Sequence, residues 1–122
     1  REQLAAMLLE GAQRFVAQAI AAMGRRDIPT KARMVNKASA IVEELTVWLD
    51  LENGGELATN LARLYDWWLN ELFEASQSNE PERLERIQRQ MGELRESWEQ
   101  AHLKQQPQQT PSPSLGSEGV VG

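Results

Sequence analysis

Few residues in this chain could perform chemistry, and their spacing does not favour it. His102 is the single histidine, and Glu99 stands three positions before it. Di-iron helical bundles use this carboxylate–histidine spacing twice, together with further glutamates that point inward. Here the pair occurs once, near the end of a predicted helix, so we interpret it as a chance spacing. We predict no metal site and no cofactor.

Nucleophilic catalysis lacks its usual residues as well. The chain has no cysteine, which removes disulfides, thiolate ligands and thiol nucleophiles. A single histidine gives no support to Ser–His catalysis, and the sequence contains no GxGxxG, P-loop or HExxH pattern. Gly54-Gly55 precedes a predicted helix and could hold an anion there, but Asp50, Glu52 and Glu56 surround it. We predict that the protein is not an enzyme.

Length and composition indicate one ordinary globular domain. The chain has 122 residues, 41% of them hydrophobic and 25% charged, with a formal net charge of -5. This charge repels polyanions on average, so we expect no nucleic-acid partner. No apolar run approaches the roughly 20 residues of a membrane span, and we expect no membrane insertion. The chain starts at Arg1 without an initiator Met, and we expect some native residues to precede it.

Apolar residues recur every three or four positions in four long segments, which is the period of amphipathic helices. We expect these helices near residues 1–25, 29–51, 56–77 and 80–103. Asp27 can cap the second helix with Pro29 in its first turn, and Asn53-Gly54-Gly55 suits a helix end. Because short connections make consecutive helices antiparallel, we predict an all-α, up-down four-helix bundle over residues 1–103.

Residues 104–122 have a different composition, dominated by Gln, Pro, Ser and Gly. Such a segment buries too little apolar surface to offset its ordering entropy. We predict a flexible, disordered C-terminal tail, with a Pro-rich ligand for another domain as the alternative.

The helical periods also predict a core and an excess of apolar surface. The residues expected to be buried along the seams are Leu8, Phe15, Leu45, Leu61, Leu64, Trp68, Met91 and Leu94. The first and third helices carry apolar arcs wider than one bundle contact consumes. We expect a partner, another copy of the chain or an N-terminal arm to cover the remainder.

Four residues on the second and third helices are candidates for that partner contact. Trp67 lies in an otherwise polar stripe, where it is either an interface residue or a tryptophan packed at a helix edge. Trp48 lies at the flank of the second helix, where the core is the competing interpretation. Ile41 and Tyr65 complete the candidate partner-binding set.

Charge is unevenly distributed along the chain. Basic residues cluster around the first loop and the second helix, at Arg25, Arg26, Lys31, Arg33 and Lys37. From residue 43 to residue 74 there are eight acids and one base, Arg63. Solvated faces explain such a pattern, and a dipolar surface that orients a protein partner is the alternative.

Two stretches resemble a known family. Residues 8–15 read LLEGAQRF, which resembles the first-helix signature of the flagellin export chaperone family FliS. Residues 41–45 (IVEEL) and 49–58 (LDLENGGELA) resemble its second-to-third helix junction, and the match continues through Tyr65-Asp66. The resemblance spans residues 1 to about 103. It departs from the family at Leu9-Glu10, where Tyr-Asp is common, at Trp67, where Tyr is common, and in lacking the N-terminal arm.

The resemblance implies a cytoplasmic chaperone without an active site. Such a protein would hold the C-terminal segment of flagellin by helix-in-groove recognition, prevent premature polymerisation and deliver the subunit to an export gate component. Two alternatives come from other classes. One is a structural helical module that self-associates, for example as a homodimer, and the other is a di-iron enzyme.

Overall fold

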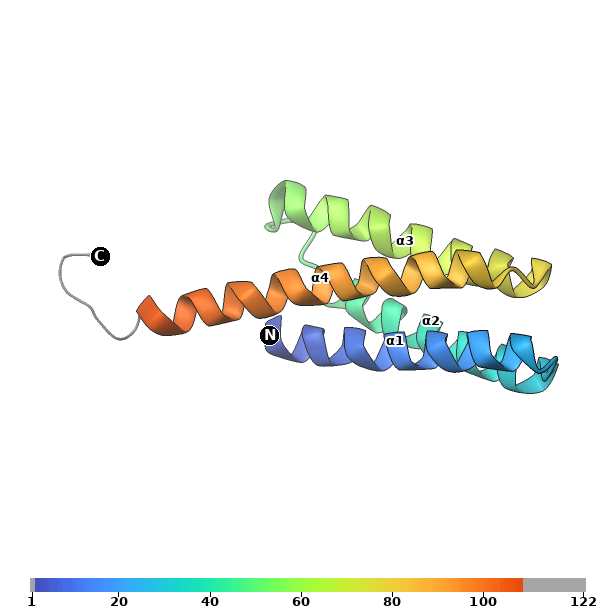
Figure 1. Ribbon diagram of the computed structural model, residues 1–122. Coiled ribbons are helices and arrows are strands. Elements are labelled where there is room, and N and C mark those ends of the chain that lie inside the picture. The colour runs from blue at the N-terminus through green and yellow to red at the C-terminus, as the bar shows by residue number, and fades with distance from the viewer. Residues whose placement is uncertain (1, 109–122) are drawn as a thin grey trace.

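The computed structural model describes residues 2–108 as an antiparallel four-helix bundle, with no strand in that range (Figure 1). The helices are α1 (Glu2–Gly24), α2 (Ile28–Val47), α3 (Gly55–Ser78) and α4 (Pro81–Gln108). α2 and α4 each pack against both α1 and α3. The predicted all-α, up-down architecture is confirmed. Residues 109–122 of the predicted tail lie outside the described range.

Two helix boundaries differ from the expected ones. α2 ends at Val47 instead of near residue 51, because residues 50–54 form a separate hydrogen-bonded turn. The carboxylate of Asp50 accepts hydrogen bonds from the backbone N and Nδ2 of Asn53, both at 3.1 Å. α4 continues to Gln108 instead of ending near residue 103, since Lys and Gln favour helix. Its last part projects beyond the start of α1 (Figure 1).

The predicted start of α2 is confirmed, and the end of α3 is held by a residue from another helix. Asp27 accepts a hydrogen bond from the backbone N of Thr30 at 3.2 Å. At the end of α3, Lys31 of α2 donates from Nζ to the carbonyl oxygen of Ser76 at 2.8 Å and to Oδ1 of Asn79 at 3.3 Å. A cation is favourable at a helix C-terminus. Lys31 is therefore buried and does not belong to the basic surface.

The core lies along the bundle axis and includes residues from all four helices. Its largest fully buried side chains are Leu9, Val16, Val42, Tyr65, Trp68, Leu72, Leu84, Ile87 and Met91. Of the residues predicted to be buried, Leu45, Trp68 and Met91 are buried. The others pack against the core and are partly exposed: Leu8, Phe15, Leu61, Leu64 and Leu94. In α1 the buried face includes Leu9 instead of Leu8. The face predicted to be buried was therefore offset by about one residue around the helix.

A pair of glutamines fixes how α1 packs against α4. The side chain of Gln13 on α1 donates from Nε2 to the backbone carbonyl oxygen of Gln88 at 3.0 Å. In return, the side chain of Gln88 donates from Nε2 to the backbone carbonyl oxygen of Gln13 at 3.3 Å. Gly92 leaves room for this exchange, because a Cβ there would lie 2.8 Å from Nε2 of Gln13. These reciprocal hydrogen bonds set the register of α1 against α4.

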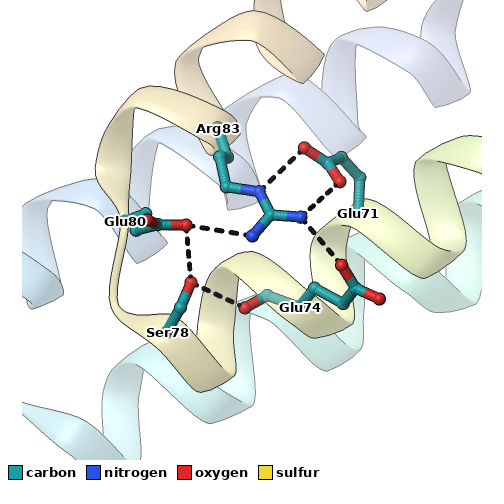
Figure 2. Close-up of polar contacts among 5 residues, drawn as sticks. All are labelled: Glu71, Glu74, Ser78, Glu80 and Arg83. Carbon is teal, nitrogen blue, oxygen red and sulfur yellow. Dashed lines mark hydrogen bonds and ion pairs between the residues drawn. The ribbon is translucent and has the colours of Figure 1, made fainter.

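The corner between α3 and α4 is closed by Arg83 (Figure 2). Its guanidinium makes a bidentate ion pair with Glu71, with N···O distances of 2.7 and 2.9 Å. It also donates to Glu74 and Glu80, each at 2.9 Å. Hydrogen bonds from Arg83 hold the pKa of Glu71 below its ordinary value. One cation of α4 thus joins two carboxylates of α3 and one of the turn between these helices.

Candidate partner-binding site

An apolar cavity of about 190 Å³ lies at the end of the bundle where α1 and α3 begin and α2 ends. Side chains from all four helices and from the segment after α2 surround it. They are Ala5, Leu45, Trp48, Leu49, Leu57, Leu61, Tyr65 and Trp98. A second hollow of about 340 Å³ lies beside it between α1 and α4, where Met7 and Leu103 are among its lining residues.

The chain leaves this end uncovered because α2 stops early. After Val47 the backbone turns away from the helix and reaches α3 only at Gly55. Gly54 is required in that turn, since a Cβ there would lie 2.5 Å from the carbonyl oxygen of Asp50 and from Cβ of Ala58. Gly55 has φ of +64°, which is a left-handed conformation. The two glycines let a short turn connect the helices without covering the cavity.

Exposed apolar side chains gather at the same end. Nine large apolar side chains are exposed among the described residues. Six of them belong to the helix ends and the turn around the cavity: Leu4, Met7, Val47, Leu51, Leu57 and Leu103. We call residues 4–7, 44–61 and 98–103 the open end. A concentration of exposed apolar groups around a hollow is typical of a protein-binding surface.

The open end is also acidic. It contains five exposed acids and no lysine or arginine: Glu44, Asp50, Glu52, Glu56 and Glu99. Glu44 orients Trp48 by accepting a hydrogen bond from the indole Nε1 at 3.1 Å. Hydrogen bonds from Asn53 hold the pKa of Asp50 below its ordinary value. The site is therefore an apolar hollow surrounded by these five acidic side chains, which we call the acidic rim.

The structure places the four predicted contact residues in three different locations. Trp48 and Tyr65 line the cavity, although Tyr65 is only 1% exposed and its burial raises its pKa. Ile41 is half-buried between α2 and α1, with Cδ1 near Gly11. Trp67 is 39% exposed. Tyr65 thus belongs to the core in this chain, and the wide apolar arc of α3 is largely used by bundle packing.

Several cavity residues were not recognised as site residues in the sequence. Leu61 was assigned to the core, and Leu49 and Leu57 fell within the predicted helices 29–51 and 56–77 without being named as contacts. One sequence signal could have indicated an uncovered apolar surface here: Leu51 and Leu57 lie on either side of Gly54-Gly55. Large apolar residues beside a glycine turn lack neighbours on the turn side.

Two further features of the described residues concern metal binding and membrane insertion. Among the described residues there is no group of three or more His, Cys, Asp or Glu side chains that could hold a metal ion. The side chain of His102 lies outside the described part. No helix within residues 2–108 is long and apolar enough to cross a bilayer.

The fold and the site define a class: a small antiparallel four-helix bundle with an apolar hollow at one end. Comparison with known proteins adds the family. A family model described as "Flagellar protein FliS" matches residues 1–106. The chain belongs to the FliS family, as its resemblance indicated.

Relatives of this chain carry consistent names. It is 38% identical over 97 residues to the flagellar secretion chaperone FliSB of Pseudomonas aeruginosa, covering 80% of this chain and 77% of that protein. It is 35% identical to FliS of Vibrio cholerae, covering 77% and 69% of the two chains. It is 33% identical to FliS of Salmonella typhimurium, covering 84% and 76%. Both of these are also named flagellar secretion chaperones, and none of the three names denotes an enzyme.

Proposed function

We propose that this chain is a cytoplasmic, flagellin-specific export chaperone. It binds the C-terminal helical segment of flagellin, prevents premature polymerisation and helps to deliver the subunit to a component of the flagellar type III export gate. The observation that carries the proposal is the open end, where a hollow and six exposed apolar side chains lie together. Membership of a family whose relatives are named flagellar secretion chaperones supports it.

The physical argument concerns the client's own apolar stripe. A chaperone that prevents polymerisation has to cover the surface through which its client would contact other copies. It therefore needs apolar surface of its own that remains uncovered when the client is absent. Trp48 and Leu57 supply such surface beside the cavity, and Tyr65 forms part of its buried wall.

Two of the predicted contacts lie away from the cavity and are proposed as secondary ones. Trp67 presents an exposed indole on α3, and Ile41 lies where α2 packs against α1, near Gly11. A long client segment could reach beyond the open end to such side chains. We propose that the bundle, residues 1–103, carries the binding, and that the tail, residues 104–122, is not needed for it.

Self-association is the second candidate, and the exposed apolar side chains at the open end favour it too. A homodimer would bury Leu4, Met7 and Leu103 without any client. Sedimentation analysis over a range of protein concentrations separates the two candidates, because a homodimer dissociates on dilution and a client-binding monomer does not change.

The test of the proposal uses flagellin from the organism that encodes this chain. Full-length monomeric flagellin is compared with flagellin that lacks its C-terminal segment, and binding to the chain is measured by calorimetry. We expect a one-to-one complex with the full-length subunit and none with the truncated one. Equal binding of both forms, or of neither, would rule out the proposal.

A further inference from the structure

The distribution of charge along the bundle gives the open end a second property besides its apolar surface. The acidic rim has five exposed carboxylates and no lysine or arginine among residues 4–7, 44–61 and 98–103. The opposite end carries both signs of charge, with exposed Arg25, Arg26 and Arg33 as well as exposed Glu74, Glu80 and Glu82. Among residues whose side chains the structure describes, the bases nearest to the open end along the sequence are Arg63 on α3 and the half-buried Arg95 on α4. Among the described side chains, the open end therefore carries one sign of charge, whereas the opposite end carries both.

Charges around an apolar contact select partners more than they add affinity. Apolar groups in the hollow would accept almost any apolar helix face, whereas like charges that meet at the rim oppose binding. An apolar segment with acidic margins would bring its carboxylates against Glu52, Glu56 and Glu99. A segment with basic margins would instead form ion pairs at the rim and associate faster.

We infer that the open end selects an amphipathic helix whose apolar face is bordered by lysine and arginine. This inference rests on the proposed function and specifies the chemistry of the segment that binds. The apolar face enters the hollow beside Trp48 and Leu57, and the basic margins lie over the acidic rim. Binding to this site weakens as salt screens the rim.

A second copy of the chain is a poorer occupant. A symmetric dimer through the open ends would place two acidic rims against each other. A head-to-tail contact with the opposite end would leave one end free at every step and would continue into an open chain of molecules. A basic segment of a different protein satisfies the rim without either consequence.

The experiment uses two synthetic helical peptides of about 20 residues with the same apolar face. Lysine borders this face in one peptide and glutamate borders it in the other. Each is titrated into the full chain, into the rim variant Glu52→Gln/Glu56→Gln and into the control variant Glu82→Gln/Glu85→Gln. The control removes the same net charge from exposed positions at the other end of α4.

We expect the lysine peptide to bind the parent at least about tenfold more tightly than the glutamate peptide at low salt. Its affinity falls about threefold or more in the rim variant and changes by less than about twofold in the control. Equal losses in both variants would show an effect of net charge alone and overturn the inference. Binding that ignores peptide charge, or a dimer that excludes both peptides, would also overturn it.

The cognate C-terminal peptide of flagellin separates this inference from the proposed function. If that peptide binds the parent and the rim variant equally, the function stands and the charge selection is wrong. If it fails to bind while the lysine peptide binds through the rim, the charge selection stands and flagellin is the wrong client.

Discussion

Single side chains in this bundle are held by partners that the sequence does not place next to them. Arg83 meets Glu71, twelve positions earlier, and Lys31 meets Ser76, forty-five positions later. In the sequence, Lys31 belongs to a basic cluster and Glu71 to an acidic stretch, and both patterns were explained as solvated faces. Only the packing of α3 against α2 and α4 shows that Lys31 and Glu71 are nearly buried and therefore need these partners.

The Glu71–Arg83 pair predicts a pH-dependent contribution to stability. Because the pKa of Glu71 is lowered in the folded chain, its stabilising effect is complete above the ordinary glutamate pKa of 4.5 and is lost as pH falls through the lower folded value. We expect Glu71→Gln to lower the urea midpoint of unfolding at neutral pH. The difference from the parent should shrink steadily below about pH 4. The exposed Glu85→Gln is the matched control, and a pH-independent deficit in Glu71→Gln would contradict this account.

Elements were predictable where a local signal defines them. The four helical periods, the Asp27 cap and the short connections led to the correct bundle, since each depends on residues close in sequence. The end of α2 was not predictable in the same way. Residues 48–51 continue the helical period, and the turn that stops the helix depends on Asp50, Asn53 and Gly54 acting together. Because that boundary was misplaced, the open end remained hidden in the sequence.

Gly54, in the turn between α2 and α3, and Gly24, at the end of α1, should respond differently to substitution by alanine. Gly54→Ala should destabilise the bundle by about 1–3 kcal/mol, because its Cβ would meet the backbone carbonyl of Asp50, which cannot move aside easily. Gly24→Ala at the end of α1 should be neutral or slightly stabilising, because nothing lies within 4 Å of its Cβ position. Chemical denaturation measures both changes. Equal effects would show that the turn is looser than described.

The whole molecule combines a closed apolar core with one uncovered end. The candidate site was predictable only in part: Trp48 was identified, whereas Tyr65 proved buried and Trp67 lies away from the cavity. Helical periods report which face of a helix is apolar, and they do not report which end of a bundle remains uncovered. That property depends on where four chain segments stop relative to one another.

The most direct test of the central claim is whether flagellin's C-terminal peptide binds at the open end. Leu57 and Phe73 are both on α3 and similarly exposed, at 68% and 64%, but only Leu57 lines the cavity. Leu57→Gln and Phe73→Gln are therefore a matched pair of variants that should both fold, as checked by circular dichroism. Calorimetric titration with the peptide should show at least a tenfold loss of affinity for Leu57→Gln, about 1.4 kcal/mol, and less than about a twofold change for Phe73→Gln. Binding by Leu57→Gln within about twofold of the parent would place the client elsewhere and contradict the account.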